Sequence, residues 1–451
     1  DPHQRVDPRD GTLPDPRGEW PVDSVLVNGR ASSNERARVA ARVEPHRHQP
    51  PRARPARSRR GRASWPAAVV VVALLVAAGT TLLIARTPAR HHANPARGTS
   101  SAPTTTTTAP APPPPTSFQV GIRTVTWVEP TGVAVNPATH QSSPRTLVTE
   151  IRYPTLAGAN GTETSNAPPS IRYGPYPVVV FAHGFNTDPS TYKVLLDSWV
   201  SAGFVVVAPV FPEENAATIT SLGGPDSYLG DMAEGDLPNE PGDLAFVVSQ
   251  VLAWSQGSPP ANTGPSADAS FLRGLANPSD LALAGQSDGG DAVAGLVFGA
   301  HYQGMYGAMP VHPRAVLVLS GAEIPGIPST YGSPTPAPDT LVVQSATDQC
   351  NLPQESTILY NTLAGPKWFL ELDNATHLGP YVGNSPAAPV VQRVTTDFID
   401  MALGRGSASP STLAADVAGS TVASLSSGAA APPITPLQEP SPSAVVQACA
   451  P

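Results

Sequence analysis

The sequence predicts an α/β fold in which helices flank a mostly parallel central sheet. Six short, nearly continuous apolar runs follow one another between residues 177 and 372, which is typical of strands covered on both faces. Segments of helical length separate several of these runs, for example 190–202 and 241–255. Because strand, helix, strand order implies right-handed crossovers, we expect a parallel sheet with its active site at the carboxyl ends of the strands.

The expected strands are placed by these runs. Two segments that alternate polar with apolar residues, 118–129 and 145–154, precede them and are predicted to be edge strands of a β-meander. A last helix is expected near 411–425, and the long polar segment 212–240 is a candidate lid. The buried strands are predicted at 177–183, 203–210, 280–285, 315–321, 340–345 and 367–372.

Changes in composition divide the chain into parts. Residues 1–100 hold 17 arginines and no lysine, but only eight acidic residues. Because the whole chain has a net charge of −8, the remaining residues must be strongly acidic. The Thr-, Pro-, Ala- and Ser-rich segments lack the apolar residues needed to offset ordering entropy. The predicted parts are a basic, disordered cytoplasmic arm (1–66), a transmembrane signal anchor (67–85), a stalk (86–117), an α/β domain (118–424) and a C-terminal tail (425–451).

Segment 67–85, AAVVVVALLVAAGTTLLIA, contains no charged residue. As a helix it would be about 28 Å long, close to the thickness of a bilayer core. Arginines before it outnumber those just after it, so the positive-inside rule predicts a single-pass protein of the cytoplasmic membrane with an extracytoplasmic catalytic domain. A cleavable signal peptide is less favoured because a long arm precedes the run. Arginines beside a span serve as topology determinants, so no nucleic-acid partner is expected.

Ser287 stands in G-Q-S-D-G, between a predicted strand and an apolar helix. One interpretation is an ordinary tight turn, for which glycines supply close packing and positive φ. The other is a nucleophile elbow, in which a strained turn lifts the serine hydroxyl above the sheet. The pentapeptide alone does not decide between the two.

Two further residues follow other strands at their carboxyl ends. Asp348 comes just after the strand at 340–345, and His377 after the strand at 367–372. Ser, Asp and His in this chain order favour a nucleophile, an orienting acid and a general base. Asp373 and Asp339 are the reserve candidates for the acid.

The motifs RTLVTEIRYP, GPYPVVVFAHGF, GFVVVAPVFP, GQSDGG, SATDQC and THLGPY carry a resemblance to a known family. From about 118 to 424 the chain resembles secreted α/β-hydrolases of the dienelactone hydrolase, chlorophyllase and platelet-activating-factor acetylhydrolase-like group. It is also similar to bacterial cutinase-type polyester hydrolases. The resemblance implies an α/β-hydrolase fold and a serine carboxylic-ester hydrolase. A lipid or polyester hydrolase is the alternative activity, and a non-catalytic surface binding module is the alternative from another class.

The chemistry assigns a task to each group. An unactivated serine hydroxyl is a poor nucleophile, so His377 would take the proton of Ser287 as it attacks an ester carbonyl. Backbone N–H groups of Phe185 and Asp288 would hold the oxyanion. Asp288 is acidic where many relatives carry an apolar, His or Met side chain, and we expect it to point away from the site. His183, in the HGF turn, is expected to be structural.

No cofactor and no metal are expected, because no Cys/His spacing suits zinc. The expected partners are an ester substrate and the membrane. Cys350 and Cys449 are the only cysteines, and in the predicted topology both lie where disulfides persist. We predict that they pair and hold Asp348 in place, with two unrelated thiols as the alternative.

Overall fold

The computed structural model describes residues 113, 115–137, 139–225, 236–258, 270–321, 330–438 and 449. All of them belong to one compact unit, Pro113–Pro451. The predicted arm and transmembrane segment lie outside the described residues. In the part of the chain that is described, no helix is both long enough and apolar enough to cross a membrane.

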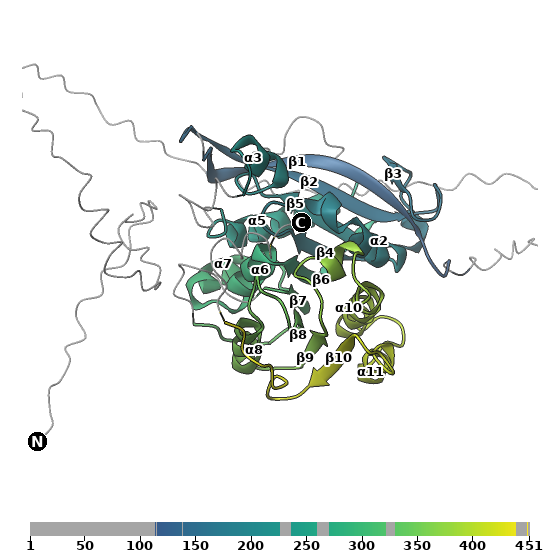
Figure 1. Ribbon diagram of the computed structural model, residues 1–451. Helices are drawn as coiled ribbons and strands as arrows, with labels where there is room; N and C mark the ends of the chain where they lie inside the picture. Colours follow the sequence, from purple (N-terminus) through teal and green to yellow (C-terminus); the bar gives the residue numbers. More distant parts are fainter. Residues whose placement is uncertain are drawn as a thin grey trace, which may run out of the picture. The chain divides into compact units, whose positions relative to one another are not determined.

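Ten strands form one sheet in the order β10-β9-β8-β7-β6-β4-β5-β2-β1-β3 (Figure 1). Neighbours from β5 to β9 run parallel, while β2 pairs antiparallel with both β5 and β1. This confirms the predicted parallel sheet and its antiparallel edge. The strands are β1 Gln119–Val135, β2 Ser142–Thr155, β3 Glu163–Ser165, β4 Tyr176–Ala182, β5 Val205–Val210, β6 Ala276–Gln286, β7 Ala315–Leu319, β8 Asp339–Ser345, β9 Lys367–Leu372 and β10 Ala423–Ser427.

Helices cover both faces of the sheet, which is why the central strands are apolar throughout. In β4, Val178 and Val180 pack into one apolar cluster, whereas Val179 and Phe181 pack into the other. The first cluster includes α5 (Glu240–Ser255), α6 (Asp288–Phe298), α7 (Gln303–Ala308) and part of α8 (Pro353–Thr362). The second includes α2 (Lys193–Ser201), α9 (Gly379–Val382), α10 (Ala388–Leu403) and α11 (Pro410–Asp416). The short helix α3 (Ala216–Ser221) follows β5.

The expected last helix is wrong over its second half. Helix α11 ends at Asp416, and Ala423–Ser427 form β10, which pairs antiparallel with β9 and extends the sheet past the predicted domain boundary at 424. The free edge of β9 offers backbone N–H and C=O groups that a following segment can satisfy. This pairing, rather than the composition of the segment, makes it a strand.

The tail after β10 runs along α8, as a surface-wrapping segment would. The amide side chain of Gln354 donates to the carbonyl of Leu437 at 3.0 Å and accepts from its N–H at 3.2 Å. Asn361 accepts from the N–H of Ala431 at 2.8 Å. Polar side chains of α8 therefore dock a tail that has few apolar residues.

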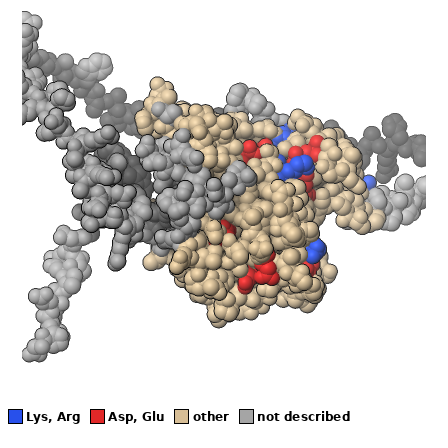
Figure 2. All heavy atoms as spheres, viewed as in Figure 1, with Lys and Arg blue, Asp and Glu red and all other residues tan. Residues whose placement is uncertain are grey.

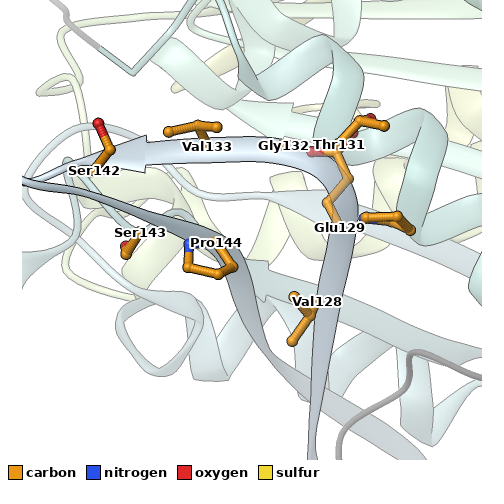
Figure 3. A pocket seen from close by; sticks show the side chains of 9 residues that line it. Val128, Glu129, Thr131, Gly132, Val133, Ser142, Ser143 and Pro144 are labelled. Carbon is orange, nitrogen blue, oxygen red and sulfur yellow. The ribbon is translucent and has the colours of Figure 1, made fainter. Parts of the chain in front are cut away.

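Strand β1 bends where its pairing with β2 shifts register, between Val128 and Val133. A surface pocket of about 480 Å³ lies at this bend and is lined by residues of both strands (Figure 3). Ser287, Asp348 and His377 are not among the residues that line it. The face shown in Figure 2 carries its Lys and Arg side chains as a few separate spots, with acidic side chains beside several of them.

Candidate active site

Ser287 occupies a strained turn between β6 and α6. Its φ of 56° and ψ of −130° lie in a region that non-glycine residues rarely adopt. A Cβ on Gly285 would collide with the backbone of Gly289, and one on Gly289 would collide with the backbone of Ala182. The two glycines therefore allow helix α6 to approach the strands, and the elbow interpretation of this motif describes the geometry better than an ordinary turn.

The structure brings Ser287, His377 and Asp348 together. His377 Nε2 lies 2.8 Å from Ser287 Oγ, and its Nδ1 lies 2.8 Å from Asp348 Oδ2. Because a carboxylate accepts, Nδ1 carries the proton in neutral His377, which leaves Nε2 to accept from the serine hydroxyl. All three side chains are buried, at 6%, 4% and 1% exposure for Ser287, His377 and Asp348. The arrangement is that of a nucleophile, a base and an orienting acid.

The loop after β8 orients Asp348. Its Oδ1 accepts from the backbone N–H of Cys350 at 2.9 Å and of Asn351 at 3.3 Å, and Gln344 Nε2 donates to Oδ2 at 3.3 Å. The reserve candidates lie elsewhere, because Asp373 is exposed and Asp339 begins β8 at its opposite end. Asp348 is thus the acid that the fold places beside His377.

The turn after β4 lies directly against the nucleophile. A Cβ on Gly184 would come 2.8 Å from the Cβ of Ser287, so only glycine allows this approach. The residues predicted to donate to an oxyanion, Phe185 and Asp288, directly follow Gly184 and Ser287 in the chain. The predicted hole therefore lies between two turns that touch.

His183 holds this turn in place through two hydrogen bonds. Its Nδ1 donates to the carbonyl of Gly184 at 2.9 Å, and its Nε2 accepts from the N–H of Phe211 at 3.0 Å. Burial lowers its pKa to about 4, so it stays neutral near pH 7. Its role in this geometry is structural, as expected.

The expectation that Asp288 points away from the site is wrong. Its carboxyl is buried and interacts with the hydroxyl of Ser287, with its own backbone N–H and, through its charge, with His377. Burial raises its pKa to about 6, although these three partners lower it. A titratable carboxyl therefore sits beside the nucleophile.

Other buried carboxyls lie near Asp288, at the amino-terminal end of α5. Glu240 is fully buried, and its pKa lies well above its usual value because of burial first, and then because of Glu214 and Asp236. Glu240 and Glu214 are interacting carboxyls in a buried environment, which favours a proton on one of them. This proton limits the negative charge that the group places near Ser287.

Sequence reasoning missed Tyr192 and Gln286. Tyr192 follows the turn after β4 that carries Phe185, which we call the oxyanion turn, and its hydroxyl donates to Gln286 Oε1 at 2.6 Å. Gln286 is the residue before the nucleophile, and its Nε2 lies 3.2 Å from His377 Nε2. The only sequence signal was an amide at the variable second position of the G-x-S-x-G motif.

The structure pairs Cys350 with Cys449, with their Cα atoms 5.0 Å apart. Cys350 also donates its N–H to Asp348, so the disulfide attaches the tail to the loop that carries the acid. The bond thus lies two residues from Asp348.

Replacing Cys449 by serine should lower the free energy of unfolding by about 2–4 kcal/mol, because the unfolded chain regains the freedom of a loop of 99 residues. Thermal melting with and without reductant measures this loss, and reductant should have no further effect on the variant. Thiol titration of the unfolded, unreduced wild type should find no free thiol; two per chain would contradict the pairing.

Comparisons with known proteins found two similarities. The family described as Chlorophyllase matches residues 167–221, which include the oxyanion turn and α2. A ferulic acid esterase from Streptomyces cinnamoneus is similar in structure, with a TM-score of 0.46 and 18% sequence identity over 66% of this chain and 95% of that one. A search of curated proteins found no significant match. The strand order, the elbow at Ser287 and the chlorophyllase match over residues 167–221 support the resemblance to α/β-hydrolases.

Proposed function

We propose that this protein is a serine hydrolase that cleaves carboxylic esters through an acyl-enzyme. The observation that carries the proposal is the buried series of hydrogen bonds from Ser287 through His377 to Asp348. The chlorophyllase match supports an esterase within the superfamily. A binding module of the same fold would have no need for a strained serine aligned with a base.

The geometry suggests how the groups share the reaction. His377 Nε2 takes the proton of Ser287 as Oγ attacks the ester carbonyl, and Asp348 stabilises the imidazolium. Backbone N–H groups at Phe185 and Asp288 receive the negative oxygen. The imidazolium then gives its proton to the leaving alcohol, and water activated by the same nitrogen attacks the acyl-enzyme. Release of the acid restores Ser287.

We also propose that the catalytic domain lies outside the cytoplasmic membrane, on the predicted anchor at 67–85. The N–H of Phe118, just after the predicted stalk, donates to the carbonyl of Ser201 at 2.9 Å, shortly before β5 begins. The chain therefore enters the sheet at the amino-terminal edge of the parallel strands, whereas the triad lies at their carboxyl-terminal edge.

A fluorophosphonate probe tests both proposals. Purified protein should be labelled at Ser287, and the Ser287→Ala variant should not be; a folded wild type that stays unlabelled would refute the hydrolase. A membrane-impermeant form of the probe should label intact cells. Labelling only after lysis would leave the hydrolase standing and reverse the proposed topology.

Replacing Asp288 by asparagine should change the pH dependence of hydrolysis. The carboxyl of Asp288 has a pKa of about 6, so it is neutral below that pH and ionised above it. Its negative charge opposes the charge that forms on the carbonyl oxygen, while asparagine is neutral throughout. The ratio of kcat/KM for Asp288→Asn to that of wild type should therefore rise about tenfold between pH 5 and 8. This change corresponds to ~1.4 kcal/mol of activation free energy.

Steady-state kinetics on a short-chain ester across this pH range measures the ratio. Asp280→Asn is a suitable control, because Asp280 is only partly buried and pairs with the exposed Arg314. A ratio for Asp288→Asn that is as flat as that of the control would show that this carboxyl does not affect the reaction.

A further inference from the structure

We propose that Tyr192 and Gln286 are positioning residues. They keep the general base, His377, and the oxyanion turn correctly placed relative to the nucleophile, Ser287. This inference rests on the proposed function and names the groups that align its machinery. Tyr192 lies in the short helix Pro189–Tyr192 after the oxyanion turn, and Gln286 ends β6 directly before Ser287. Both side chains are buried, at 0% and 1% exposure.

Hydrogen bonds link the two loops through these side chains. The N–H of Gly184 donates to the hydroxyl of Tyr192 at 3.1 Å, and that hydroxyl donates to Gln286 Oε1 at 2.6 Å. Gln286 Nε2 in turn lies 3.4 Å from the carbonyl oxygen of His377, to which it donates. The link therefore runs from the oxyanion turn, past the nucleophile, to the loop that carries the base.

The partners determine the orientation of the Gln286 amide. A backbone carbonyl only accepts, so the amide group facing His377 must be the NH₂ group. The Tyr192 hydroxyl already accepts from Gly184, so its own hydrogen is free for Gln286 Oε1. Each donor in this series is matched to an acceptor. Hydrogen bonds in such a series polarise and strengthen one another in a low-dielectric interior.

The amide also limits where the proton on His377 can go. Gln286 Nε2 lies 3.2 Å from His377 Nε2, compared with 2.8 Å for Ser287 Oγ. After His377 has taken the serine proton, its Nε2 is a donor, and the NH₂ group of Gln286 cannot accept from it. The proton is then available to Ser287 or to the leaving group, which is where the reaction needs it.

The ring and the hydroxyl of Tyr192 can be separated by mutation. The ring packs against Phe181, with centroids 4.9 Å apart, and belongs to the apolar cluster beneath the turn. Phenylalanine keeps this packing and removes only the hydroxyl. Burial keeps the pKa of Tyr192 far above its usual value, so the hydroxyl remains a donor at every working pH.

The test compares Tyr192→Phe with Tyr153→Phe. Tyr153 is equally buried, and its hydroxyl donates to the carbonyl of Ala167 at 2.7 Å, within another part of the sheet. On a short-chain ester, Tyr192→Phe should lower kcat about 10- to 100-fold with KM changed little, because the reacting groups lose alignment rather than binding. Tyr153→Phe should leave kcat unchanged. Thermal melting checks that both variants are folded.

Gln286→Glu provides a second test whose result depends on pH. An ionised carboxylate accepts from Tyr192 but cannot donate to the carbonyl of His377, whereas a neutral carboxyl can. The ratio of its kcat to that of wild type should therefore rise as the pH falls. If Tyr192→Phe matches Tyr153→Phe, or if the Gln286→Glu ratio is flat, the positioning role is wrong although the hydrolase stands. A wild type without activity or fluorophosphonate labelling would instead refute the proposed function.

Discussion

Replacing Ser287 or His377 by alanine should lower kcat on a short-chain ester by about 10⁵- to 10⁶-fold while the protein remains folded. The two residues share one hydrogen bond, and neither can form the acyl-enzyme without the other. Triad members act as a unit, so the double variant should be hardly worse than either single variant. Single-turnover kinetics and circular dichroism measure the two parts of this prediction.

The assignment of the acid has a matched control in the same region. Asp348→Asn should lower kcat about 10⁴-fold, because asparagine cannot hold the tautomer in which Nδ1 of His377 carries the proton. Asp373→Asn should stay within a few fold of wild type, since Asp373 is exposed and follows β9. The opposite ranking of these two variants would transfer the role of the acid to Asp373.

Replacing Arg145 by methionine should lower the free energy of unfolding by about 3–5 kcal/mol. Arg145 is only 2% exposed; its Nε lies 2.7 Å from Asp243 Oδ1, and its Nη2 lies 2.7 Å from Asp236 Oδ1. Both carboxyls are fully buried, so the variant leaves them without their cation. Urea unfolding measures the loss.

The pH dependence of this loss gives an independent check. Burial raises the pKa of Asp243, and it should rise further without Arg145. A carboxyl with a native pKa above its unfolded value makes the native state more stable as the pH falls, so the loss should be smaller at pH 5 than at pH 8. Arg314→Met, which removes a partly exposed pair with Asp280, should cost about 0–1 kcal/mol. Equal losses for the two variants would contradict the importance of the buried cluster.

The buried cluster of Arg145, Asp236 and Asp243 also explains how the segment after β5 is held against the sheet. Glu213 accepts from the N–H of Val135 at 2.8 Å, and its own N–H donates to Asp236 at 2.9 Å. Glu213 and Asp236 lie near the two ends of the predicted lid at 212–240, of which 226–235 lie outside the described residues. Arg145 on β2 therefore fastens both ends of this segment to the sheet.

The sequence by itself predicted the buried strands and the three residues, Ser287, Asp348 and His377, that the structure brings together. Parallel strands buried on both faces must be apolar throughout, so the runs at β4 to β9 could be recognised without a structure. Ser287, Asp348 and His377 could be found because each directly follows such a strand, and the carboxyl ends of parallel strands meet at one edge of the sheet. These inferences need only local pattern and chain order.

Tertiary structure alone decided the features that depend on contacts between distant segments. Ala423–Ser427 has no strong strand pattern and becomes β10 only because β9 has a free edge. Asp288 is buried and interacts with Ser287 and His377, and burial raises its pKa. Tyr192 and Gln286 are 94 positions apart, and their hydrogen bond follows from the pairing of β4 with β6. Hydrophobic periodicity reports which face of an element is buried, but the partner of a buried polar group is set by three-dimensional packing.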